Sequence, residues 1–143
     1  MAGLKMAEYF AYGSATVASA GIEGLAYAAY RGAGALVVRE TAKRIESLIK
    51  VGNVMDRGGL TVVGRALQKH GNRTGSIFPK VTGNAAAINV QGERVLNRIL
   101  TNSNVTSVTR HHVGLGNVLE YRIPGSQGAR FSGDGKTFLG FLE

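Results

Sequence analysis

The chain has 143 residues, which is enough for one domain or for a small domain with an appended segment. Hydrophobic residues make up 44% of it, and the absence of cysteine excludes disulfides, thiolate metal sites and a cysteine nucleophile. The formal net charge of +8 is unevenly distributed: residues 1–56 contain six basic and five acidic residues, whereas residues 57–143 contain eleven basic and four acidic residues. A region this basic attracts phosphate backbones, although a merely soluble basic surface would have the same charge.

The first part of the chain is apolar. Residues 7–38 are rich in Ala, Gly, Tyr and Val, and the longest uncharged stretch, Tyr9–Ile22, is shorter than the roughly 20 residues that span a bilayer. Only one basic residue, Lys5, precedes this stretch, so the N-terminus does not resemble a signal peptide. We expect residues 1–57 to be an apolar helical segment without a stable membrane span. It would act as a linker or pack as an ordinary helical hairpin.

A clearer helix follows the apolar stretch. Apolar residues recur at helical spacing from Val38 to Ile49, while charged residues cover the other face. Gly52 and Asn53 can end this helix, and the Gly58-Gly59 pair is a plausible hinge. We therefore predict a domain boundary between residues 57 and 58.

Two further helices are predicted after the hinge. Leu60, Val63, Leu67 and His70 fall on one face of a short helix, which Gly71 can end. A polar loop, residues 71–83, separates it from a second helix. This second helix starts at Asn84 or at Asn89 and extends to about residue 100, and its apolar residues again recur at helical spacing.

The period then changes from 3.6 to 2, which indicates strands. Alternating or short apolar runs cover residues 104–112, 117–124, 128–132 and 136–142. Ser132-Gly-Asp-Gly135 between the last two runs is a hairpin signal, because Asp-Gly tolerates positive φ angles. The predicted fold class is α+β: N-terminal helices followed by a four-stranded antiparallel sheet that packs one face on the helices.

Strand alternation predicts one polar face of this sheet. Side chains two residues apart point to the same side, so the polar faces of three strands can coincide. They would then bring together Arg110, His112, Glu120, Arg122 and Arg130. A carboxylate or imidazole can take the 2′-OH proton of RNA, a second group can protonate the 5′-oxygen, and guanidinium groups can stabilise the phosphate. The competing interpretation is ordinary cross-strand pairing on a solvated face.

The histidines leave several alternatives open. His111 and His112 are adjacent, so a straight strand directs only one of them to a given site. His70 is either a packed residue on the apolar helix face or an acid–base group facing the sheet. No spacing typical of zinc ligands occurs, and Gly114–Gly116 is not followed by a helix, so we expect neither a metal nor another cofactor.

Several short motifs follow one another in the second part of the chain. They are Gly64-Arg-Ala-Leu-Gln-Lys-His-Gly71, Gly83-Asn84 with Asn89 and Gln91-Gly92, Gly128-Ala-Arg-Phe131, Asp134-Gly-Lys136 and Gly140-Phe-Leu-Glu143. Together they resemble the C-terminal toxin domains of bacterial polymorphic and contact-dependent growth inhibition toxins. Such domains are similar to the barnase, EndoU, colicin and RelE superfamily. The resemblance implies helices followed by a four-stranded antiparallel sheet, which agrees with the order predicted above.

The resemblance also implies a function. Domains of this kind are ribonucleases, often acting on tRNA, that are delivered into the cytoplasm of a competing bacterium and blocked by a cognate immunity protein. In a delivered toxin, residues 1–57 would be an entry or linker segment. An acidic immunity protein would complement a basic cleft. One departure stands at residues 124–127, where Pro-Gly-Ser-Gln replaces the expected Asp-Gly turn. A register shift there would move Arg130 to the other face of the sheet.

The leading hypothesis is therefore a toxin ribonuclease that needs no metal and produces a 2′,3′-cyclic phosphate. His112 and Glu120 are the predicted acid–base pair, with His70 as a substitute for either. The predicted phosphate ligands are Arg110, Arg122 and Arg130, and the residues predicted to steer RNA are Lys69, Arg73, Lys80 and Lys136.

Three alternatives remain. One is a non-catalytic nucleic-acid-binding protein, although the standard RNA-binding motifs are missing. Another is a membrane-active toxin that acts through residues 7–38. The last is an artificial fusion of two unlike halves.

Overall fold

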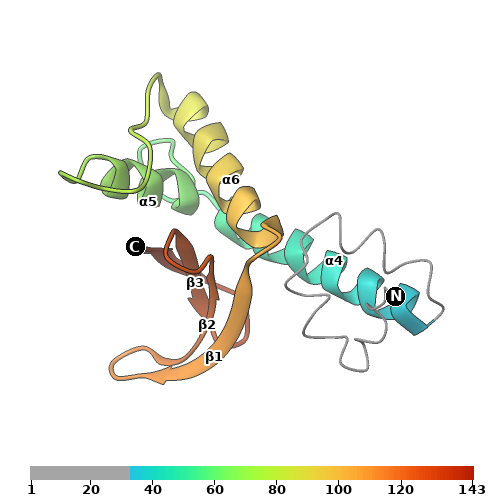
Figure 1. Ribbon diagram of the computed structural model, residues 1–143. Coiled ribbons are helices and arrows are strands. Elements are labelled where there is room, and N and C mark those ends of the chain that lie inside the picture. The colour runs from blue at the N-terminus through green and yellow to red at the C-terminus, as the bar shows by residue number, and fades with distance from the viewer. Residues whose placement is uncertain (1–32) are drawn as a thin grey trace.

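The computed structural model describes residues 33–143, and these form three helices followed by a four-stranded antiparallel sheet (Figure 1). The helices are α4 (Ala33–Gly52), α5 (Val62–Gly71) and α6 (Ala85–Thr101), and the strands are β1 (Thr106–His112), β2 (Gly116–Arg122), β3 (Gly128–Ser132) and β4 (Phe138–Leu142). This arrangement confirms the predicted α+β class. Residues 1–32 of the predicted apolar segment lie outside the described residues.

Side-chain caps set the starts of helices α5 and α6. The Thr61 hydroxyl accepts a hydrogen bond from the Gly64 amide at 3.0 Å and thereby begins α5. Asn84 begins α6 in the same way, accepting from Ala87. Asn89, the other predicted start, lies inside α6 and ties it to the segment before α5: its side-chain oxygen accepts from the Thr61 amide at 2.7 Å.

The sheet has the strand order β1-β2-β3-β4, with every neighbouring pair antiparallel. In the register of β2 and β3, Glu120 lies opposite Arg130. The unexpected turn at residues 124–127 therefore does not shift Arg130 to the other face. The predicted Ser132–Gly135 hairpin is also present, with Gly135 at a φ of 74°, and Asp134 accepts hydrogen bonds from the Ser132 hydroxyl and the Lys136 amide.

One hydrophobic core joins the helices to one face of the sheet. The apolar residues predicted to face inward from α5 and α6 are buried, as is the side of the sheet formed by Leu119, Tyr121 and Phe131. Ile45 and Leu48 of α4 belong to the same core. The boundary predicted between residues 57 and 58 stays a prediction, but the core extends across it.

A search of the described helices for a candidate membrane span found none that combines the necessary length and apolar character.

Candidate functional site

The strand register brings five predicted site residues onto one face of the sheet. Antiparallel partners share a face, and residues two apart along a strand do so as well. The pairs Val108–Glu120 and Glu120–Arg130, together with the alternation along each strand, therefore place Arg110, His112, Glu120, Arg122 and Arg130 on the face opposite the helical core. Sequence alternation thus predicted this grouping correctly.

Glu120 is the centre of the polar face. Its side chain is fully buried, with 0% exposure, and three arginines surround its carboxylate. Oε1 lies 3.2 Å from Nε of Arg110 and 3.1 Å from Nε of Arg122. Oε2 lies 2.8 Å from the terminal nitrogen of Arg130 and accepts a hydrogen bond from its Nε at 2.9 Å. We refer to these four residues as the Glu120 cluster.

The arginines keep Glu120 ionised. Burial alone would raise the pKa of the Glu120 carboxyl, but the hydrogen bonds from Arg130 and Arg122 outweigh burial, so the pKa lies below its ordinary value of 4.5. The contact with Glu120 does not occupy all the hydrogen-bond donors of the three arginines. The side chains of Arg110 and Arg122 are 54% and 42% exposed, and that of Arg130 is 21% exposed. Guanidinium donors therefore remain available to an anion on this face.

His112 lies on the same face, at the end of β1. It is the register partner of Gly116, whereas Val108 is the partner of Glu120, so four residues of β1 separate the two positions, a distance of about 13 Å along the strand. Nδ1 of His112 is buried and has no hydrogen-bond partner among the described residues. Its neighbour His111 points to the other face, where Nδ1 lies 3.4 Å from the side-chain oxygen of Asn117. The structure therefore places His112, and not His111, on the face of the Glu120 cluster.

His70 lies on the opposite side of the sheet from Glu120. Its ring packs against Phe78 and Phe141, at centroid distances of 5.2 and 6.1 Å. Phe141 is the partner of Ala129, which precedes Arg130 in β3 and so points to the helical side. The structure does not bring His70 together with the other predicted catalytic residues.

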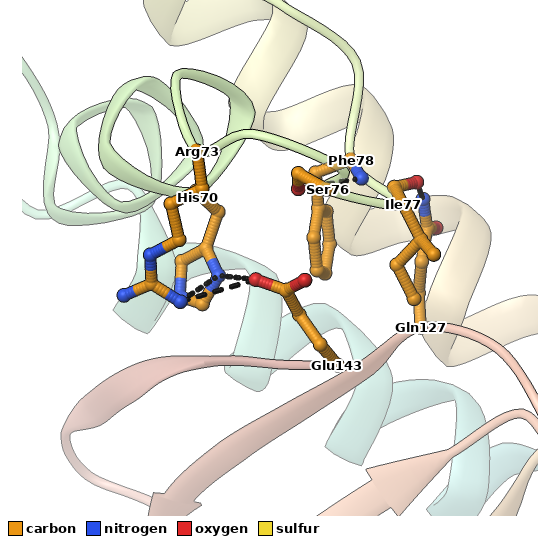
Figure 2. A network of polar contacts seen from close by, with 7 residues as sticks. All are labelled: His70, Arg73, Ser76, Ile77, Phe78, Gln127 and Glu143. Atoms are coloured by element: carbon orange, nitrogen blue, oxygen red, sulfur yellow. Dashed lines mark hydrogen bonds and ion pairs between the residues drawn. The ribbon is translucent and has the colours of Figure 1, made fainter.

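His70 has its own polar partners, which Figure 2 shows. Nδ1 lies 2.9 Å from Oε2 of Glu143, and Arg73 donates to the same oxygen at 3.1 Å. First the hydrogen bond from His70 and then that from Arg73 lower the pKa of Glu143, although partial burial opposes them. Because an ionised carboxylate can only accept, Nδ1 is assigned the proton. We refer to His70, Arg73 and Glu143 as the His70 cluster.

Glu143 was missed as a functional candidate in the sequence. It stands 73 residues from His70, and no spacing signal connects them. The motif Gly140–Glu143 was part of the family resemblance, but it carried no role for this side chain. Of the residues predicted to steer RNA, Lys69, Lys80 and Lys136 are exposed, while Arg73 is engaged with Glu143.

Other kinds of site were sought in the same part of the chain. Residues 33–143 contain no group of three or more His, Cys, Asp or Glu side chains that could hold a metal ion. A hollow of about 290 Å³ lies between α4 and the strands β1 and β2. No carboxylate or imidazole lines it, and the one phenol in its lining belongs to the buried Tyr121.

Helices followed by an antiparallel sheet, with a buried carboxylate among three arginines on the open face, define a small α+β domain with a cationic sheet surface. Comparison with family models matches residues 49–143 to the CdiA C-terminal tRNase toxin domain. This chain therefore belongs to the family of CdiA C-terminal tRNase toxin domains and is a toxin nuclease.

A solved structure has a similar fold. The toxic C-terminal tip of CdiA from Pseudomonas aeruginosa, in complex with an immune protein, is 29% identical to this chain and superimposes with a TM-score of 0.57. The match covers 66% of this chain and 99% of that chain. No curated protein sequence matches this chain significantly.

Proposed function

We propose that this toxin nuclease is an endoribonuclease that cleaves RNA, with tRNA as its substrate, and that it needs no metal ion. The 2′-oxygen attacks the adjacent phosphorus, the bond from phosphorus to the 5′-oxygen breaks, and the products are a 2′,3′-cyclic phosphate and a 5′-hydroxyl. The reaction then needs one base, one acid and positive charge at the phosphate. Side chains on the polar face of the sheet can supply all three.

The Glu120 cluster is the observation that supports this proposal. Three guanidinium groups lie around one ionised carboxylate, and two of them remain substantially exposed. Arginine donors match the geometry of phosphate oxygens, so Arg110, Arg122 and Arg130 would bind the scissile phosphate. The same groups would stabilise the additional negative charge of the pentacoordinate transition state.

Glu120 would act as the general base once the phosphate has bound. In the free protein the arginines lower its pKa and make it a weak base. A bound phosphate shares those guanidinium groups and adds a nearby negative charge, and both effects raise the proton affinity of the carboxylate. Phosphate binding would thus prepare Glu120 to accept the 2′-OH proton.

His112 would act as the general acid. It lies on the same face as Glu120. The pair His112–Gly116 is two residues beyond Arg110–Val118, which is itself two residues beyond Val108–Glu120, so His112 and Glu120 are separated along the strands. In-line displacement needs acid and base on opposite sides of the phosphorus, so this separation leaves room for a phosphate between them. His70 would not substitute for either residue, because it lies on the helical side of the sheet.

The remaining basic residues would attract RNA without touching the reacting atoms. Lys69, Lys80 and Lys136 are exposed, and with Arg73 they would raise the rate of encounter with a polyanion. An acidic immunity protein would cover the same basic surface and block the reaction. The Pseudomonas aeruginosa toxin tip is in complex with an immune protein, and we extend this partnership to the present chain together with delivery into the cytoplasm of a target cell.

Cleavage of purified tRNA in EDTA tests the proposal. Wild-type protein should convert tRNA into discrete fragments whose 3′ ends carry a cyclic phosphate and whose 5′ ends accept phosphate from a polynucleotide kinase without prior phosphatase treatment. A 5′-phosphate at the newly formed 5′ end of the 3′ fragment would contradict the proposed reaction. Salt-sensitive binding of intact tRNA would instead favour a non-catalytic nucleic-acid-binding protein.

A further inference from the structure

The hollow between α4 and the sheet has the chemical character of a binding site for an RNA backbone. Its polar groups are the guanidinium of Arg44, the hydroxyls of Thr41, Ser107 and Thr109, and the phenol of the buried Tyr121. Buried Ile45 and Leu119 are among its apolar lining. A guanidinium and several hydroxyls are the side-chain donors that proteins use most often for phosphate and sugar oxygens.

Arg44 is free to serve an anion. Its side chain is exposed on α4, and it forms no ion pair with any residue in 33–143. The exposed charged residues of α4 are Arg39, Lys43, Arg44 and Lys50 against Glu40 and Glu46, so the helix beside the hollow carries a net positive charge that favours an anion.

The hollow lies across the edge strand β1 from the proposed catalytic face. Its strand residues Ser107 and Thr109 point to the helical side of the sheet, whereas Val108 between them points to the face of its register partner Glu120. β1 is an edge strand, and every residue from Thr106 to His111 is exposed. An RNA strand bound at Arg110 and Arg122 can therefore continue over the edge of β1 without displacing other parts of the sheet.

We propose that Arg44, with the hydroxyls of Thr41, Ser107 and Thr109, forms a second subsite that binds a phosphate–ribose unit of the same RNA strand beyond the point where it passes over the edge of β1. The proposal rests on the ribonuclease function proposed above. The match to the tRNase toxin family begins at residue 49, so Arg44 lies before the matched region. The helix α4 then contributes to substrate binding as well as to the core.

Replacing Arg44 in the full chain tests the subsite. Arg44→Ala should raise KM for tRNA about five- to tenfold and leave kcat within about twofold, because the side chain contacts substrate away from the reacting phosphate. The slope of log(kcat/KM) against log[KCl] should become shallower by about 0.7, the value for one lost phosphate contact with single-stranded RNA. Thr109→Val, which removes one hydroxyl and keeps the shape, should raise KM about twofold.

The matched control is Arg94→Ala, which removes one exposed arginine from α6. An unchanged KM and salt slope in Arg44→Ala, or equal effects in Arg44→Ala and Arg94→Ala, would overturn the subsite. If the wild-type chain does not cleave tRNA, the proposed function fails. The dissociation constant of tRNA, measured with and without Arg44, then decides the subsite alone: a loss of at least fivefold with Arg44→Ala supports it, and equal affinity overturns it.

Discussion

Two clusters, each with one glutamate and at least one arginine, lie on opposite sides of one sheet. The Glu120 cluster joins a carboxylate to three arginines on the open face, and the His70 cluster joins a carboxylate to a histidine and an arginine on the helical face. In the first, the carboxylate is fully buried and guanidinium groups face solvent. In the second, the histidine is buried against a pair of aromatic rings and the carboxylate is 32% exposed.

The difference concerns which groups remain available to a substrate. The Glu120 cluster presents several unused donors of one charge on an open surface, which suits a phosphate. The His70 cluster satisfies its charges internally and connects α5 to the end of β4 (Figure 2). We infer that the first cluster serves catalysis and the second serves stability, and the following predictions separate these roles.

The largest expected effect is on cleavage by Glu120→Gln. The amide keeps the shape of the side chain but cannot accept the 2′-OH proton, so kcat for tRNA cleavage should fall about 10²- to 10⁴-fold. Initial rates at equal concentrations of folded protein measure this effect. Glu93→Gln, on the exposed face of α6, is the matched control and should cleave at the wild-type rate. A Glu120→Gln rate within about threefold of wild type would remove the proposed base.

The two adjacent histidines provide a comparison within one strand. His112→Ala should lower kcat about 10²-fold through loss of the general acid, whereas His111→Ala should have little effect because that side chain points to the other face. Steady-state cleavage of tRNA by both variants checks this prediction. Wild-type rates in both variants would show that neither histidine protonates the leaving group.

His70→Ala should reduce stability and spare catalysis. The substitution removes ring packing against Phe78 and Phe141 and a hydrogen bond to Glu143, so the free energy of unfolding should fall by about 2–3 kcal/mol. Urea unfolding followed by circular dichroism measures this change. Cleavage per folded molecule should remain close to wild type.

The smallest expected effect is on acid stability. Hydrogen bonds from His70 and Arg73 hold the pKa of Glu143 below its ordinary value of 4.5. A lowered pKa in the folded state means that this group stabilises the protein above pH 4.5 and that the contribution is lost as the pH falls through the folded value. Glu143→Gln should therefore unfold with a weaker pH dependence below pH 4.5. Urea titrations between about pH 6 and pH 3 test this, and identical slopes for variant and wild type would contradict it.

Local patterns made much of the fold predictable. The start of α6 at Asn84, the helical spacing in α6, and the period-two alternation in β2 and β3 all depend on residues close in the chain. The same alternation placed Glu120 and its arginines on one face, because side-chain direction in a strand follows from its period.

Long-range contacts were not predictable from such patterns. The pairing of His70 with Glu143 spans 73 residues, and the contact of Gln127 with the backbone oxygen of Ile77 spans 50 residues. The burial of Ile45 and Leu48 against residues beyond the predicted hinge likewise depends on tertiary packing. Amphipathicity indicated that this helix packs against something, but not which partner it has.

The most direct test compares cleavage of tRNA in EDTA by wild type, Glu120→Gln and His70→Ala at equal concentrations of folded full-length protein. The account predicts discrete cleavage by wild type and His70→Ala at similar rates, and a loss of at least about 10²-fold for Glu120→Gln. Cleavage by Glu120→Gln together with an inactive but folded His70→Ala would contradict it, and would place the catalytic centre at the His70 cluster on the helical side of the sheet.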